Sequence, residues 1–166
     1  SGDRDDQPAP PSRIMVIGGG IAGAALAAGL HRRGAEVVLL EAATGIGKGA
    51  SGNRMALQSP RLTVDHNAMS RFSAACLSFA ARLSDLSGAT IACGVLALDL
   101  PERIALRHHV FRGQTWPVDL LRAAGPDDWP TSVEESGSAI VYPFGRVIRP
   151  DTLLPYLMGD TQLVSG

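Results

Sequence analysis

Apolar and polar residues alternate in blocks over residues 14–41, and this pattern predicts a strand, a helix and a second strand. An apolar run at residues 14–17 enters a cluster of three glycines. Ala27 and Leu30 then follow Gly23 at helical spacing, and Gly34 stands where a helix would end. A second apolar run, residues 37–40, ends on Glu41. We therefore expect one βαβ unit over this stretch.

The glycine spacing is typical of a loop that binds the pyrophosphate of a dinucleotide. Gly18 allows a sharp turn, Gly20 allows close approach of the backbone, and Gly23 lets the helix pack against the strand. The free N–H groups of the first helical turn and the helix dipole favour a phosphate there. Glu41 lies 18 residues after Gly23. A carboxylate at that point accepts hydrogen bonds from a ribose 2′-OH and would repel a 2′-phosphate, which disfavours NADP.

An alternative interpretation of residues 14–30 is a targeting or membrane segment, because they carry no charge and follow Arg13. The stretch is rich in Gly and Ala and lies behind an acidic, proline-rich segment. A membrane span needs about 20 strongly apolar residues, and a signal peptide begins with a basic region. We therefore prefer the dinucleotide fold and expect no membrane partner.

The segment after Glu41 is rich in glycine and reads as a flexible loop that extends to residue 62. Its small residues allow close approach to a ligand. Ser51 and Asn53 add hydrogen-bonding groups, and Arg54 adds a cation for a phosphate or carboxylate. An ordinary surface loop is an equally good interpretation.

Residues 67–86 have helical periodicity, with Asp65 or Asn67 as cap and Gly88 as stop. We expect the Phe72 and Phe79 stripe of this helix to pack in the core. Further along, the patterns predict a strand at 91–98, a helix at 102–112 and a short helix at 118–124. Strands at 139–142 and 146–148 would be joined through 143–145. A helix from Pro150, shortened or kinked by Pro155, and a strand start in 159–166 complete the chain.

Composition bounds the function classes. The chain has 166 residues, 45% of them hydrophobic, which is enough for a core, and a net charge of −1, which gives no global basic field. Cys76 and Cys93 match no metal or disulfide spacing, so we expect buried free thiols in a reduced, cytoplasmic protein. His108 and His109 are adjacent and would face different sides of a helix, which makes a poor metal pair. Residues 1–13 read as a disordered leader or linker.

Several segments resemble known flavoproteins. The stretch GGGIAGAALAAGLHRRGAEVVLLE resembles the N-terminus of FAD-dependent oxidoreductases of the D-amino-acid oxidase (DAO) and glycine oxidase type. GKGASGNRMALQSPRL is similar to the second FAD-contacting loop in the flavin domain of the bifunctional tRNA methylaminomethyl-2-thiouridine biosynthesis proteins. MSRFSAACLSFAARL, CGVLAL and FGRVIRPDTLLPYL are similar to the helix and substrate-domain elements that follow. Members are longer than this chain, and Met55 stands where a polar residue is expected.

The resemblance implies an α/β fold, with a Rossmann-type FAD-binding βαβ unit and part of an α+β substrate domain. The FAD-binding half would cover 14–64, a helix 65–88, the partial substrate domain 89–158 and a tail 159–166. It implies FAD as cofactor, and no residue has the context of a catalytic acid or base. The cofactor-binding candidates are Gly18, Gly20, Ile21, Ala22, Gly23, Glu41, Ala42, Gly49, Ala50, Ser51, Asn53 and Arg54.

By the same resemblance, the parent protein would oxidise the C–N bond of a secondary amine. In the tRNA-modifying branch this step removes a carboxymethyl group from a modified wobble uridine, and a methyltransferase domain is fused to the flavin domain. One alternative is a small-molecule amino-acid or amine oxidase, which the near-neutral charge favours; Arg54, Arg61 and Arg71 on one face would favour RNA. Further alternatives are an inactive truncated fragment, since two strands make a marginal parallel sheet, and an NAD-binding domain.

Overall fold

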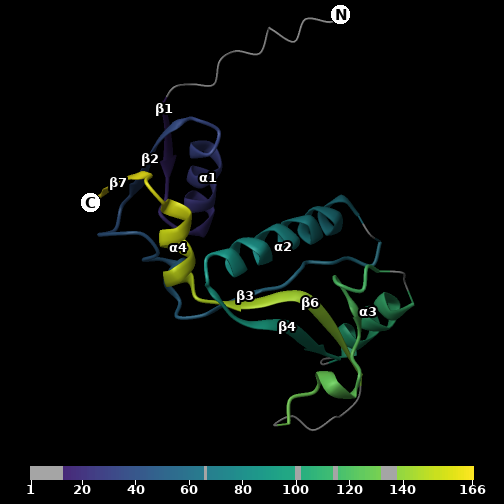
Figure 1. Cartoon of the computed structure of the whole chain (residues 1–166). Helices are drawn as coiled ribbons and strands as arrows, with labels where there is room; N and C mark the ends of the chain where they lie inside the picture. The colour runs from purple at the N-terminus through teal and green to yellow at the C-terminus, as the bar shows by residue number, and fades with distance from the viewer. Residues whose placement is uncertain (1–12, 66, 100–101, 114–115, 132–137) are drawn as a thin grey trace, which may run out of the picture. The chain divides into compact units, whose positions relative to one another are not determined.

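The computed structural model describes residues 13–65, 67–99, 102–113, 116–131 and 138–166 (Figure 1). The chain divides into two compact units. The first unit runs to Arg54 and takes in Pro150–Gly166, and the second unit comprises Met55–Arg149. The expected segment boundaries at residues 64, 88 and 158 therefore differ from this division. The predicted leader at 1–13 lies outside the described residues except for Arg13.

A three-stranded parallel sheet forms the centre of the first unit. Its strand order is β1-β2-β7, with β2 between the other two. The helix α1 connects β1 to β2, as the apolar pattern predicts for a βαβ unit. The strand expected in the last residues of the chain is β7, and it pairs in parallel with β2. The bounds are β1 Arg13–Ile17, α1 Ile21–His31, β2 Glu36–Glu41 and β7 Gln162–Ser165.

Small residues bring α1 close to the sheet of the first unit. Ala24 and Ala27 are completely buried, and Leu39 of β2 is also fully buried. Helix α4 (Pro150–Met158) packs against α1 and buries Leu153, Leu154, Leu157 and Met158. Pro150 begins this helix as expected. Pro155 lies inside it, and the helix continues three residues further, so Pro155 does not end it.

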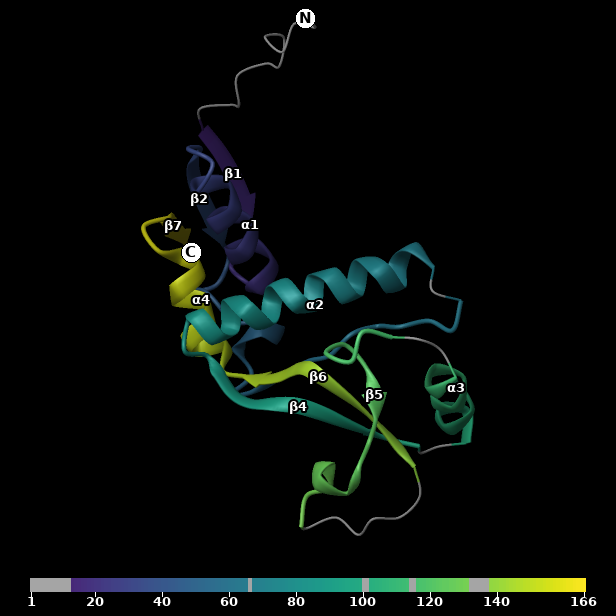
Figure 2. The same cartoon turned by 45° about the vertical axis from the view of Figure 1, so that its right-hand side comes forward.

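The second unit is built on an antiparallel sheet in the order β3-β6-β4, with the short β5 also paired to β6. Two helices, α2 and α3, accompany this sheet (Figure 2). Leu77 of α2 and Phe111 of α3 join Ile140 and Tyr142 of β6 in one hydrophobic core. The bounds are β3 Ala56–Gln58, α2 Ala68–Leu86, β4 Thr90–Leu98, α3 Glu102–Arg112, β5 Arg122–Ala123 and β6 Ala139–Ile148. The sequence predicted α2, β4 and α3 to within two residues.

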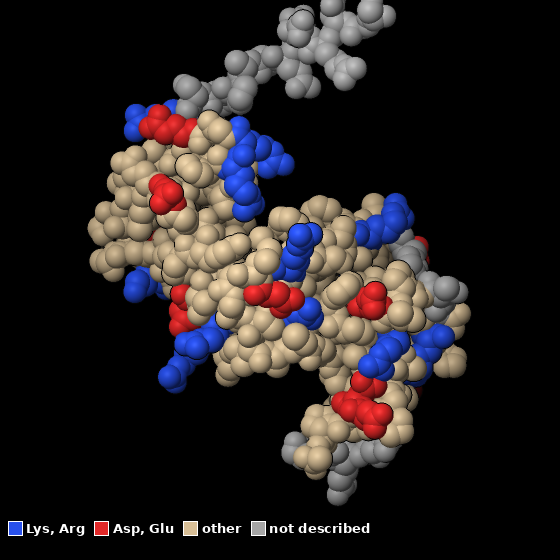
Figure 3. All heavy atoms as spheres, viewed as in Figure 1, with Lys and Arg blue, Asp and Glu red and all other residues tan. Residues whose placement is uncertain are grey.

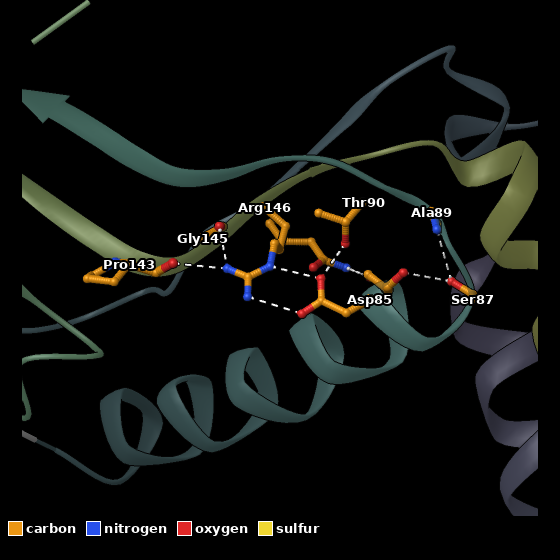
Figure 4. Close-up of polar contacts among 9 residues, drawn as sticks. Asp85, Ser87, Ala89, Thr90, Pro143, Gly145 and Arg146 are labelled. Atoms are coloured by element: carbon orange, nitrogen blue, oxygen red, sulfur yellow. Dashed lines mark hydrogen bonds and ion pairs between the residues drawn. The ribbon is translucent and has the colours of Figure 1, made fainter. Parts of the chain in front are cut away.

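A buried arginine ties α2 to β6 (Figure 4). The Arg146 side chain is 11% exposed and donates to both carboxylate oxygens of Asp85, at 3.1 and 3.2 Å. It also donates to the carbonyl oxygens of Pro143 and Gly145. The Thr90 hydroxyl donates to Asp85 at 2.6 Å. These bonds give the buried guanidinium its partners, and the hydrogen bonds from Arg146 and then Thr90 hold the pKa of Asp85 below its usual value.

The prediction that the Phe72 and Phe79 stripe of α2 packs in the core is wrong. Phe72 and Phe79 are 66% and 60% exposed. The buried face of α2 consists instead of Ser70, Leu77, Ala81 and Ser84, and this face packs on the sheet. Small residues permit close helix–sheet packing, and periodicity alone does not tell which side of an apolar helix meets a partner. Cys76 lies on the exposed side and Cys93 on the edge strand β4, so the prediction of buried thiols is also wrong.

Two further predictions are corrected in the last third of the second unit. The strands expected at 139–142 and 146–148 are one strand, β6, which passes through Pro143 without a turn. The pairs Cys93–Arg146 and Val95–Tyr142 leave one residue of β4, Gly94 with φ +83°, opposite residues 143–145, so the extra residues bulge from β6 and the pairing continues on both sides. The helix expected at 118–124 is a single turn closed onto the Pro117 carbonyl, followed by β5. The expected loop at 42–62 contains the short strand β3.

Candidate functional site

The turn between β1 and α1 has the backbone that the glycine spacing predicts. Gly18 has φ +104°, and its N–H donates to the Leu40 carbonyl at 2.8 Å. A Cβ on Gly23 would overlap the Gly18 carbonyl oxygen. Only glycine therefore fits at both positions without displacement of the turn. The result is a tight passage from strand to helix, with the first turn of α1 beside the ends of β1 and β2.

The N-terminus of α1 meets the loop that follows β2. The Ser51 hydroxyl accepts the N–H of Ile21 at 3.0 Å. A Cβ on Gly20 would lie 3.1 Å from that hydroxyl oxygen, so Gly20 permits this close contact. The N–H groups of Ala22 and Gly23 have no acceptor within the helix, because the first turn precedes any i−4 carbonyl. These groups and the helix dipole form an anion-binding terminus.

The Glu41 carboxylate lies against the glycine turn. One of its oxygens accepts the N–H of Gly19 at 2.5 Å, and the other accepts the N–H of Ala43 at 2.9 Å. The hydrogen bonds from Ala43 and then Gly19 lower the pKa of this carboxyl, so that it is charged at neutral pH. A carboxylate has about four lone-pair positions, and two remain for the hydroxyls of a ligand.

The glycine-rich loop encloses a cavity of about 310 Å³ next to Ser51. The Gly47 N–H donates to the Gly19 carbonyl at 2.9 Å, which fastens the loop to the turn. A Cβ on Gly52 would overlap the Gly47 carbonyl oxygen, so the short helix η1 (Ala50–Gly52) needs a small residue there. The lining consists of Ile46, Gly47, Lys48, Ser51, Gly52, Asn53, Asp151, Leu154 and Pro155.

These features fit a dinucleotide. Any side chain at Gly20 or Gly23 would fill the space beside the turn. The N-terminus of α1 supplies N–H donors, and the charged Glu41 carboxylate beside it suits ribose hydroxyls. Lys48 is the cation in the cavity lining, where it can face a phosphate. The arrangement can bind a pyrophosphate and orient the adjoining ribose.

Most of the sequence-predicted site residues lie together around this turn and loop. Gly18, Gly20, Ile21, Ala22 and Gly23 form the turn and the start of α1. Glu41 ends β2 and Ala42 follows it, and Gly49, Ala50, Ser51 and Asn53 belong to the loop. Arg54, which follows Asn53, is not part of the cavity lining.

Sequence analysis missed Gly19, Gly47, Lys48 and the α4 residues of the lining. The repeated Gly45, Gly47 and Gly49 spacing indicated a close backbone approach, but no local signal linked residues 151–155 to this loop.

The two adjacent histidines lie apart from this site, in the second unit. His108 is 1% exposed, and its Nδ1 lies 2.5 Å from Asp99. Arg112 and Ser138 also bond to Asp99, so the carboxylate joins α3 to the end of β4. Within the described ranges, no group of three potential ligands could hold a metal ion. Among the helices that the structure describes, none has the length and apolar character to cross a membrane.

Comparisons with known proteins agree with this geometry. The family model described as "FAD dependent oxidoreductase" (DAO) matches residues 13–162. The tRNA 5-methylaminomethyl-2-thiouridine biosynthesis bifunctional protein MnmC of Nitrosospira multiformis is 34% identical over 90% of this chain. The protein of the same name from Shewanella denitrificans is 34% identical over 82% of this chain. The chain spans 25% and 19% of the lengths of these two relatives.

A solved structure has the same fold. Glycine oxidase from Geobacillus kaustophilus superimposes with a TM-score of 0.66 at 20% sequence identity, over 94% of this chain and 47% of that protein. The α/β architecture of the chain is thus that of this oxidase. The chain belongs to the FAD-dependent oxidoreductase family of the DAO type.

Proposed function

We propose that this chain binds FAD through its first unit and forms part of an oxidoreductase that acts on the C–N bond of a secondary amine. The observation that carries the proposal is the joint position of Glu41, Ser51 and the α1 N-terminus around the Gly18 turn. The N–H groups of Ala22 and Gly23 would hold the pyrophosphate, and Glu41 would hold the adenosine ribose. Lys48 and Asn53 would line the pyrophosphate or flavin side.

Bound FAD would supply the hydride-acceptor chemistry for the carbon next to an amine nitrogen. The residues of this chain bind and orient the cofactor. Glu41 stays charged because two backbone N–H groups stabilise its anion, and this charge selects hydroxyls over a 2′-phosphate. Ser51 and Gly47 fix the second loop on the turn, which preorganises the site before the cofactor arrives.

The names of the sequence relatives, which are bifunctional proteins of tRNA 5-methylaminomethyl-2-thiouridine biosynthesis, support a tRNA substrate and a parent protein with a second function. The wobble position of the uridine and a fused methyltransferase domain are part of the proposal through the resemblance of the sequence alone. A cytoplasmic location of the parent protein is part of the same proposal. On the face shown in Figure 3, however, Lys and Arg side chains are scattered among acidic and neutral ones and form no continuous basic surface. This face would therefore offer a tRNA no cluster of phosphate contacts.

A small-molecule amine oxidase is the second candidate. The name of the solved structure with the same fold, glycine oxidase, favours an amino-acid substrate. The two candidates share the FAD site and differ only in what reaches the flavin. The near-neutral charge of the chain suits this alternative.

Anaerobic reduction of bound flavin tests the C–N chemistry. The FAD-loaded parent protein is mixed with tRNA that carries the carboxymethylaminomethyl uridine, with glycine or sarcosine, and with a secondary alcohol as control. Bleaching by tRNA supports the first candidate, and bleaching by the free amino acids supports the second. Bleaching by the alcohol alone would overturn the proposed C–N specificity.

A further inference from the structure

We propose that the second unit contains a binding site for an oxyanion, a carboxylate or a phosphate group, in the cavity between α3, β6 and residues 60–63. This cavity has a volume of about 360 Å³, enough for a small ligand or the charged end of a larger one. None of the described residues that line it is acidic. The lining consists of Pro60, Arg61, Leu62, Thr63, Arg107 and Tyr142.

Two arginines supply the charge. Arg61 and Arg107 both line the cavity, and neither forms a salt bridge with an acidic side chain of the described residues. The guanidinium of Arg107 lies over the Phe111 ring, 5.9 Å from its centroid, which orients it without neutralising it. The nearest acidic residue along the chain, Asp65, lies outside the lining, and hydrogen bonds from Thr63, which lines the cavity, and from Asn67 lower the pKa of its carboxyl. An anion in the cavity would therefore meet two arginines that form no salt bridge within the described residues.

A largely buried tyrosine lines the cavity beside these cations. Tyr142 is only 6% exposed, and its side chain forms no hydrogen bond with another described residue. Burial raises the pKa of its phenol, and the nearby Arg107 lowers it to a smaller extent. The phenol is therefore protonated at neutral pH and can donate a hydrogen bond. Two guanidinium groups and one O–H donor match the acceptor-only character of a carboxylate or phosphate.

The walls of the cavity are fixed by contacts within the second unit. The Arg61 N–H donates to the Ser73 hydroxyl at 2.7 Å, and the Thr63 N–H donates to the Ser70 hydroxyl at 3.2 Å. Both serines belong to α2, so the 60–63 segment is held along that helix. Tyr142 and Leu62 belong to the hydrophobic core. A preformed site of this kind loses little conformational entropy when it binds a ligand.

The test is an NMR titration of the whole ¹⁵N-labelled chain at constant ionic strength, with inorganic phosphate in one series and acetate in another. The amide signals of Leu62, Thr63 and Tyr142 report on this cavity. Those of Gly19 and Ile21 report on the FAD site, where phosphate can also bind. We expect saturable shifts at Leu62, Thr63 and Tyr142 in at least one series; the series that gives them identifies the ligand group.

Variants separate a built site from general attraction to positive charge. Arg107→Gln should weaken binding about tenfold, because a charge-assisted hydrogen bond is lost, and Tyr142→Phe should weaken it several-fold. Arg82→Gln on the exposed face of α2 removes an equal charge and should leave binding unchanged. If Arg107→Gln alters the fold, Arg107→Lys keeps the charge and tests the same cavity. Shifts confined to Gly19 and Ile21, no shifts at all, or equal losses in Arg107→Gln and Arg82→Gln would overturn the proposal.

Discussion

The Glu41 carboxylate accepts the backbone N–H of Gly19 at 2.5 Å and so ties the end of β2 to the glycine turn before α1. A second bond, from the Ala43 N–H at 2.9 Å, fixes the other oxygen. Both bonds are stronger to an anion than to a neutral group. The same charge that orders the turn is therefore available to the ribose of a bound dinucleotide.

Replacement of Glu41 by glutamine should weaken FAD binding about tenfold. The amide has no negative charge and only one acceptor oxygen, so it loses a hydrogen bond to Gly19 or Ala43 as well as its attraction for ribose hydroxyls. Fluorescence titration with FAD measures the effect. Glu36→Gln is the matched control, because Glu36 lies at the other end of β2 and pairs only with the exposed Arg13. Equal affinity in wild type and Glu41→Gln would contradict this role.

Gly23→Ala should disrupt the first unit, whereas Gly29→Ala in the same helix should not. A Cβ at Gly23 would overlap the Gly18 carbonyl, but one at Gly29 would meet only the end of the Arg33 side chain, at 3.7 Å. Alanine at position 29 should stabilise α1 by about 0.5–1 kcal/mol, because glycine is a poor helix former. Urea denaturation and FAD titration check both variants. A Gly23→Ala variant with normal FAD affinity would show that the turn is less tight than described.

Phe72 is exposed and Leu77 is buried on the same helix, α2, so substitutions at these two positions should differ in their effect on the free energy of unfolding. Phe72→Gln should change the free energy of unfolding by less than about 0.5 kcal/mol, because its side chain is already in water. Leu77→Ala should cost about 2–5 kcal/mol, because Leu77 is 4% exposed in the core. Urea denaturation measures both values. A large loss in Phe72→Gln would mean that Phe72 is covered in solution.

Asp128 should retain its charge down to unusually low pH. The hydrogen bonds from Arg122 and then Gly125 lower its pKa from 3.8 to about 2. Because the folded-state pKa is the lower one, this stabilisation is complete above about pH 4 and is lost as pH falls through about 2. The loss should amount to about 1 kcal/mol, since the Arg122 side chain is 42% exposed and solvent screens the pair.

NMR of the Asp128 carboxyl carbon measures this pKa directly. Arg122→Gln should move it back towards 3.8, and Arg82→Gln, which removes an arginine of α2 that is not bonded to Asp128, should not. A normal pKa in the wild-type protein would contradict the bidentate Arg122–Asp128 pair.

The βαβ unit could be predicted from sequence because its signals are local. The Gly18, Gly20 and Gly23 spacing, the small residues of α1 and the position of Glu41 all lie within one short segment. The sequence predicts two strands in place of β6, because Pro143 and Gly145 indicate a turn unless it is known that residues 143–145 bulge opposite Gly94 within one strand. The burial of α2 was mispredicted for a related reason. Phe72 and Leu77 are both apolar, and only the position of the sheet decides which one is covered.

The central claim is that this chain binds FAD at the Gly18 turn, beside Glu41 and Ser51. The most direct test is the absorption spectrum of the purified chain after incubation with FAD and removal of free cofactor. We predict that wild type retains about one FAD per chain and shows the visible flavin bands, whereas Glu41→Gln retains much less under the same conditions. The second loop should contribute in the same way, so Ser51→Ala should also lose cofactor. A folded wild-type chain, verified by circular dichroism, that retains no FAD would contradict the claim.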